Sequence, residues 1–207
     1  YSIKDIRATD GHKYIGEKPF VDEDGNTSIR FEDDDGTISG TLKKNTEVVL
    51  EFETTSHGGK CGDNLTWTLD GNGTLTISGS GAMSNFFIYQ NVAPWLKNWD
   101  KIARVVVEPG VTSIGDYTFL GCAGLTNVTI PDGVTYIGYQ AFGDCKSLAS
   151  VTIPGSVRNI GGFAFQNCTG LTSMTILEGT TSIGENAFYG CTGLTSVTIP
   201  GSVVSIG

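Results

Sequence analysis

A 23-residue period runs through the second half of the sequence and constrains the fold more than any other feature. Leucine, cysteine, phenylalanine and glycine each recur at this interval. The recurring residues are Leu125, Leu148, Leu171 and Leu194; Cys122, Cys145, Cys168 and Cys191; Phe119, Phe142, Phe165 and Phe188; and Gly115, Gly138, Gly161, Gly184 and Gly207. Such a period indicates a repeat architecture, in which each copy buries its apolar face against its neighbours. The first copy, from Ile102, is degenerate, and the copy from Leu194 is truncated.

Within one copy, the apolar residues alternate and then turn. Val151 and Ile153 occupy alternating positions that predict a strand facing a core, and Pro154 ends that strand because it cannot donate to a ladder. A second inward-facing segment follows, and Gly161 is expected to serve a tight bend. The stretch 164–168 should then return the chain through a short helical or 3₁₀ turn. Stacked copies of this unit form a parallel β solenoid.

The repeat pattern LxxVxIPxxVxxIGxxAFxxCxx resembles the BspA-like, or treponemal-type, leucine-rich repeats over residues 102–207. Thr118 departs from the pattern where alanine is usual, and Leu177 where proline is usual. The upstream stretch CGDNLTWTLDGNGTLTISGSGAM, residues 61–83, looks like the segment that often precedes such arrays. The resemblance implies a mainly β leucine-rich-repeat solenoid in a bacterial surface or secreted protein, with a role in adhesion.

Residues 59–101 are expected to cap the solenoid. Leucine and tryptophan alternate in 64–69 and leucine and isoleucine in 75–77, and the Asp-Gly-Asn-Gly turn between them predicts a hairpin. The segment 94–99 reads as a short helix with Pro94 in its first turn. Because an open solenoid end exposes an edge, we expect three tryptophans of this region to seal the stack, namely Trp67, Trp95 and Trp99.

Residues 1–58 are expected to form a small β module, immunoglobulin-like or an incomplete version of that fold. The most strand-like stretches are 28–31, 37–42 and 47–53. A linker at 56–59 suits the change in composition. The chain begins at Tyr1 and stops within a repeat at Gly207, so we expect it to be a segment of a longer protein.

The net charge of −9 argues against nucleic acid or an anionic membrane as a partner. No apolar run is long enough to cross a membrane. The two histidines, His12 and His57, lie in no recognisable catalytic or metal motif, and no nucleophile elbow or phosphate loop is present. We therefore expect no enzymatic activity, cofactor or metal. The acidic stretches 22–26 and 33–36 lack the spacing of a calcium loop and read as solvated turns.

The four repeat cysteines are expected to form a ladder of buried free thiols. Equivalent positions on neighbouring strands lie about 4.8 Å apart, a distance that would permit disulfides. However, translation keeps the Cα–Cβ bonds parallel, so the sulfur atoms do not converge. Cys61 lies outside the period and is the least predictable of the five cysteines.

Strand positions between the core residues should point outward and form a continuous face for a partner. Arg104 and Val106 would continue its rows into the first copy. The face comprises Asn127, Thr129, Ser150, Thr152, Ser173, Thr175, Ser196 and Thr198. An equally plain interpretation is a polar strand face with high β-propensity and no partner.

A second candidate surface comprises the aromatic residues near the bend, Tyr117, Tyr139, Phe163 and Tyr189. They do not share one repeat position, so the sequence does not predict a common patch. Taken together, these features lead us to expect an extracellular module that binds a protein or a glycan. The alternative is a stalk that presents other domains of a longer surface protein.

Overall fold

The computed structural model describes residues 13–14, 20–21, 27–33, 36–42 and 57–207. The chain divides into two compact units, Tyr1–His57 and Gly58–Gly207. In the first unit, β3 pairs antiparallel with each of the other three strands. These strands are β1 (Lys13–Tyr14), β2 (Phe20–Val21), β3 (Thr27–Asp33) and β4 (Gly36–Leu42). The strands expected at 28–31 and 37–42 are present. The expected strand 47–53 and the acidic residues 22–26 and 34–35 lie outside the described residues.

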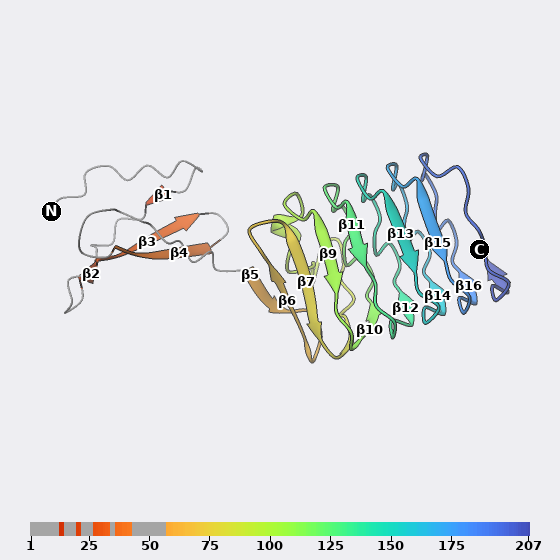
Figure 1. Cartoon of the computed structure of the whole chain (residues 1–207), viewed down its shortest axis with the longest axis horizontal. Helices are drawn as coiled ribbons and strands as arrows, with labels where there is room; N and C mark the ends of the chain where they lie inside the picture. Colours follow the sequence, from red (N-terminus) through yellow and green to blue (C-terminus); the bar gives the residue numbers. More distant parts are fainter. Residues whose placement is uncertain (1–12, 15–19, 22–26, 34–35, 43–56) are drawn as a thin grey trace. The chain divides into compact units, whose positions relative to one another are not determined.

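The second unit is a β solenoid whose turns each contribute a strand to two separate sides (Figure 1). The first side consists of β5 (His57–Lys60), β6 (Leu65–Leu69), β7 (Thr74–Gly79), β9 (Arg104–Val107), β11 (Asn127–Thr129), β13 (Ser150–Ile153) and β15 (Ser173–Ile176). The second consists of β8 (Gly81–Ala82), β10 (Val111–Ile114), β12 (Tyr136–Ile137), β14 (Asn159–Ile160), β16 (Ser182–Ile183) and β17 (Ser205–Ile206). The mainly β solenoid expected from the period is confirmed.

The strand register follows the sequence period. Ser150 pairs with Ser173 and Ile153 with Ile176, each 23 residues on, in parallel strands. Along β13 and β15, exposed and buried residues alternate, so the aliphatic residues point into the core. Residues that are equivalent by sequence are therefore neighbours in space, inside and outside the solenoid alike.

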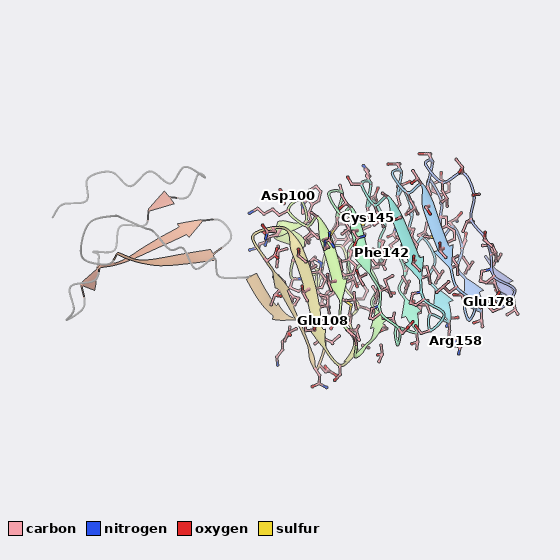
Figure 2. The ribbon with its side chains drawn as sticks, viewed as in Figure 1. Asp100, Glu108, Phe142, Cys145, Arg158 and Glu178 are labelled. Carbon is pink, nitrogen blue, oxygen red and sulfur yellow. The ribbon has the colours of Figure 1, made fainter. Side chains whose placement is uncertain are left out.

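A column of stacked phenylalanine rings runs through the core. Neighbouring ring centroids of Phe119, Phe142, Phe165 and Phe188 lie 5.2, 5.1 and 5.9 Å apart, with interplanar angles of 25°, 5° and 20°. Figure 2 shows Phe142 and Cys145 within the solenoid, among the side chains of neighbouring turns. Each ring packs on its own copy in the next turn, which ties the stability of one turn to that of its neighbours.

The repeat glycines are required for space rather than for a bend. Gly161 does not adopt a positive φ. A β-carbon built on it would lie 2.7 Å from the carbonyl carbon of Gly138, and one on Gly138 would lie 2.5 Å from the amide nitrogen of Asp116. The amide of Gly161 donates to the carbonyl of Ile137 at 2.8 Å. Gly161 was expected to serve a tight bend; instead, it is the position at which the backbone packs directly against the backbone of the previous turn.

The return segment, expected as a short helical or 3₁₀ turn, consists of turns with hydrogen bonds of the 3₁₀ type and forms no helix. Gln166 donates to the Phe163 carbonyl and Cys168 to the Phe165 carbonyl, both in the i→i+3 pattern of a 3₁₀ turn. Positive φ angles of 56° at Phe163 and Asn167 interrupt any helical run. Among the described residues, the one 3₁₀ helix is η1 (Leu96–Asn98), which lies in the segment expected to be helical.

Two of the three tryptophans seal the first turn. Trp95 is 1% exposed and stacks on Phe119 with centroids 5.7 Å apart, and Trp67 contacts it edge-on at the same distance. The Trp95 indole N–H donates to the Thr118 carbonyl at 2.9 Å. Trp99 was expected in this seal, but its side chain is 42% exposed and lines a cavity beside η1 instead. The predicted hairpin is confirmed: β6, which carries Trp67, pairs antiparallel with β7.

Replacing Trp95 with alanine should destabilise the solenoid strongly. The change removes the stacked contact with Phe119 and leaves a cavity, so we expect a loss of about 3–5 kcal/mol in the free energy of unfolding. Trp99→Ala is the matched control and should cost less than about 1 kcal/mol. Urea unfolding followed by circular dichroism measures both. Equal losses would show that the buried ring does not hold the end of the stack.

Gly161→Ala tests the close approach of the backbones. The added methyl group would collide with the Gly138 backbone, so we expect a loss of about 3 kcal/mol or failure to fold. Gly71→Ala adds the same methyl group in an exposed turn with no heavy atom within 4 Å, and should change the free energy of unfolding by less than about 0.5 kcal/mol. Thermal unfolding of both variants is the measurement. A Gly161→Ala protein as stable as the Gly71→Ala protein would contradict the account.

Candidate binding surfaces

The outward residues of the first side form two rows that cross the turns, which we call the strand face. Parallel pairing aligns Arg104 with Asn127, Ser150 with Ser173, and Thr152 with Thr175, and a single bridge joins Thr175 to Thr198. The members that are exposed are Thr129, Ser150, Thr152, Ser173, Thr175, Ser196 and Thr198. Asn127 is half-buried, so the first row is less accessible at its start. The residues expected to lie together therefore do so.

Hydroxyl groups on the strand face are not used by the fold. The hydroxyls of Thr126 and Thr172, just before the strands, donate to the carbonyls of Ala103 and Ala149 one turn back, at 2.9 and 3.2 Å. Within residues 57–207, by contrast, no side-chain hydrogen bond is made by Thr152 or Thr175. Each hydroxyl there keeps one donor and two acceptor sites for a partner.

Three of the four bend aromatics, together with a loop residue, form a continuous row that the sequence did not predict. This aromatic row comprises Phe87, Tyr117, Tyr139 and Phe163, whose successive ring centroids lie 6.4, 5.4 and 5.6 Å apart. Tyr189 is exposed but makes none of these ring contacts. Tyr139 joins the row although it sits one residue before the repeat position of the other two bend residues, because the neighbouring turns bring the rings together.

Two members of the row hold strained backbone conformations. Tyr117 and Phe163 both have φ of 56°, a region that bulky side chains rarely adopt and that costs about 1–3 kcal/mol each. The same position in the other turns holds Gln140 and Asn186, also at positive φ. Their backbones are fixed between turns, since Tyr117 donates to the Tyr139 carbonyl at 2.9 Å. The repeat therefore imposes this conformation whatever the side chain.

Polar side chains border the aromatic row. One carboxylate oxygen of Asp116 accepts a hydrogen bond from the Tyr139 amide at 2.7 Å and from the Tyr136 hydroxyl at 3.4 Å. The Gln140 amide donates to the Gln166 carbonyl oxygen at 2.7 Å, joining two turns. Burial, with Tyr139 and Asp116 nearby, raises the pKa of Tyr117. The border of the row therefore carries one carboxylate and several neutral hydrogen-bonding groups.

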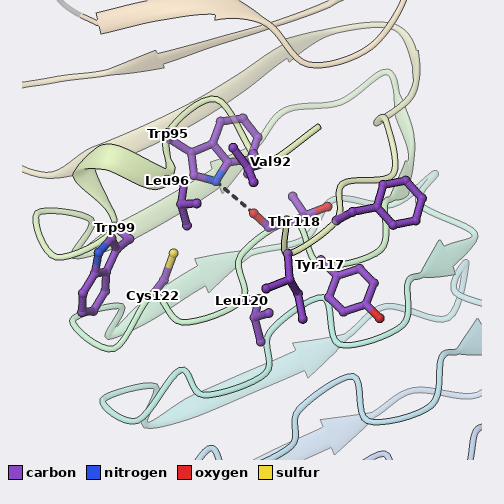
Figure 3. Close-up of a pocket in the computed structure, with 11 residues that line it drawn as sticks. Val92, Trp95, Leu96, Trp99, Tyr117, Thr118, Leu120 and Cys122 are labelled. Carbon is purple, nitrogen blue, oxygen red and sulfur yellow. Dashed lines mark hydrogen bonds between the residues drawn. The ribbon is translucent and has the colours of Figure 1, made fainter. Parts of the chain in front are cut away.

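A small apolar cavity lies between η1 and the first repeat (Figure 3). Trp99, Leu96 and Leu120 face it, and the Cys122 sulfur lies at its inner wall. Burial raises the pKa of Cys122 to about 12, so this thiol is not a nucleophile at neutral pH. The cavity carries no chemistry beyond packing.

The repeat cysteines form the ladder of buried free thiols predicted from their spacing. All five cysteines are free and buried. The thiols of Cys145, Cys168 and Cys191 donate to the carbonyls of the phenylalanines 26 residues earlier, Phe119, Phe142 and Phe165, at 3.3, 3.1 and 3.0 Å. These thiols satisfy buried carbonyl groups between turns, which is a structural role.

The free energy of unfolding should decrease as pH rises through the alkaline range, because the thiols of Cys61 and Cys122 are buried. Burial raises the pKa of Cys61 to about 11 and of Cys122 to about 12, against 9.0 for an ordinary thiol. Between pH 9 and 11 the unfolded chain loses these protons and the folded chain keeps them, so stability present below pH 9 is lost as pH rises. Each such thiol contributes a slope of up to about 1.4 kcal/mol per pH unit.

Cys122→Ala should therefore reduce the pH slope of the free energy of unfolding by about one thiol's contribution, measured by urea unfolding across the same pH range. The variant's lower stability at neutral pH, from the cavity it leaves, does not enter the slope. An unchanged slope would show that Cys122 ionises equally in the folded and unfolded chains.

Nothing in the described part of the chain points to a metal centre or a membrane span. Within it, no group of three or more His, Cys, Asp or Glu residues could hold a metal ion. No helix in the same residues is long and apolar enough to cross a bilayer.

Comparison with known proteins identifies the repeats. The family described as "BspA type Leucine rich repeat region (6 copies)" matches residues 96–207. A solved leucine-rich-repeat protein from Eubacterium ventriosum is 34% identical, with a TM-score of 0.64 over 74% of this chain and 40% of its own. One from Bacteroides ovatus is 28% identical, with a TM-score of 0.51 over 62% of this chain and 37% of its own. The chain thus spans less than half of either structure. No match was found among proteins with curated descriptions.

Proposed function

This chain belongs to the family of BspA-type leucine-rich-repeat proteins, and from that premise we propose that it is a non-enzymatic binding module of a bacterial surface or secreted protein. Its partner is an extracellular protein or glycan, bound through the strand face. The bacterial origin of the two similar solved structures supports this assignment. The acidic net charge of −9 is unsuited to nucleic acid.

The observation that carries the proposal is the run of uncommitted hydroxyls on the strand face. Ser150, Thr152, Ser173 and Thr175 are exposed on strands held in fixed register. Rigid strands present these groups without the entropy cost of ordering a loop on binding. A regular array of small polar side chains across several turns suits an extended partner.

The experiment is binding of the purified, monomeric segment to a panel of extracellular-matrix proteins and glycans, beside the double variant Ser150→Lys and Thr175→Lys. These two positions are not paired in register, so the new charges do not face each other directly. We expect saturable binding that weakens at least about tenfold in the variant, because a lysine head group in the interface must lose its hydration.

A matched control carries the same added charge away from the strand face, as Asn159→Lys and Thr169→Lys, both at exposed positions. It should bind as the parent does. Equal loss in both variants would indicate a general charge effect and no site on the strand face. A folded monomer that binds no member of the panel would instead favour a stalk that presents other domains.

A further inference from the structure

We propose that the aromatic row is a binding site for an extended, neutral glycan, with the open groove at its Phe87 end as part of the site. The groove has a volume of about 430 Å³ and is lined by Phe87, Ile88, Tyr89, Gln90 and Tyr117. The row lies on the return segment of each turn and not on the strands. It is therefore independent of the strand face and of the partner proposed there.

The row has the periodicity of a polymeric ligand. One ring comes from the cap loop and one from each of three successive turns, with centroid separations of 6.4, 5.4 and 5.6 Å. These separations are close to the advance of one sugar along an extended polysaccharide. Neighbouring rings are tilted by 38°, 60° and 62° to one another, so a glycan running along the solenoid would stack on the ring faces that are exposed and not on every ring in turn.

Phe87 and Tyr139 are accessible, whereas Tyr117 and Phe163 are half-buried, and the exposed rings have the chemistry that a sugar face requires. Phe87 is 55% exposed and Tyr139 is 37% exposed, and beside them Tyr89 is 91% exposed. The face of an aromatic ring is electron-rich, and the C–H groups on one face of a pyranose are weakly positive, so the two stack favourably. The repeat keeps Tyr117 and Phe163 in this row at positive φ, where smaller polar residues are tolerated better.

Sugar hydroxyls would find partners along the border of the row. Asp116 uses one carboxylate oxygen for the fold, and no hydrogen bond to its other oxygen is found among residues 57–207. Gln140 keeps its carbonyl oxygen and Gln166 keeps its amide N–H groups beyond the bond that joins them. Aromatic faces flanked directly by amides and a carboxylate suit a ligand that is apolar on one side and hydroxylated at its edge.

Charge selects a neutral ligand. Asp116 adjoins Tyr117, and Glu185 lies in the turn next to Phe163, whose amide donates to the Glu185 backbone carbonyl at 2.9 Å. No lysine or arginine lies within three sequence positions of any member of the row. An anionic polysaccharide would meet acids without compensating cations, whereas a neutral one is not penalised.

The test is calorimetric titration of the 207-residue chain with three hexasaccharides: β-1,4-linked glucose, β-1,4-linked N-acetylglucosamine and a sulfated heparin fragment. We expect one or both neutral hexasaccharides to bind and the heparin fragment not to. Tyr139→Ser and Phe163→Asn should each weaken binding about tenfold, the factor that one stacked aromatic contact supplies.

Phe163→Asn separates binding from folding. Asparagine tolerates positive φ and occupies the equivalent position at Asn186, so the thermal midpoint should stay within a few degrees of the parent. Tyr189→Ser is the matched control, because Tyr189 is exposed but outside the row, and its affinity should equal that of the parent. The proposal is overturned if no neutral hexasaccharide binds, if heparin binds better, or if Tyr189→Ser loses as much affinity as Tyr139→Ser. Loss of a protein partner in Phe163→Asn without any glycan binding would also overturn it.

Discussion

Direct contact between neighbouring backbones at the repeat glycines is the constraint on which the rest of the solenoid depends. A β-carbon at Gly138, Gly161 or Gly184 would lie 2.4–2.7 Å from backbone atoms of the previous turn. With no side chain between them, the turns approach as closely as hydrogen bonds allow. That spacing brings the phenylalanine rings into stacking distance and leaves each thiol within reach of a carbonyl of the previous turn.

The regular repeat of turns along the solenoid axis determines the arrangement of the surface residues as well as that of the core residues. Because every turn repeats its neighbour, outward residues fall into rows with the spacing of the strands, as the paired Thr152 and Thr175 do. Hydroxyls just before the strands, such as that of Thr126, and the buried thiols of the return segment donate to carbonyls of the previous turn, whereas hydroxyls on the strand face remain available. A surface of this kind extends with each added turn, so the contact area for a partner grows with repeat number.

The 23-residue period predicted those features that arise when one turn is repeated regularly along the solenoid axis. Inward and outward strand positions, the thiol ladder and the strand face all follow from the 23-residue interval. The aromatic row did not, because Tyr139 is offset by one residue from Tyr117 and Phe163, and Phe87 lies outside the repeats. Only the positive φ angles and the packing of neighbouring turns bring these rings together. The spacing of the tryptophans likewise could not tell that Trp95 packs on Phe119 while Trp99 stays 42% exposed at the wall of a cavity.

Amide hydrogen exchange resolved by residue tests the central claim most directly, namely that contacts between turns hold the fold. The amides of Gly138, Gly161 and Gly184 donate to the carbonyls of Ile114, Ile137 and Ile160, at 2.9, 2.8 and 2.8 Å. The account predicts that these amides are among the slowest to exchange and that protection falls towards the last turn, at Gly207. Exchange at Gly161 as fast as at Gly71, in the exposed hairpin turn, would contradict it.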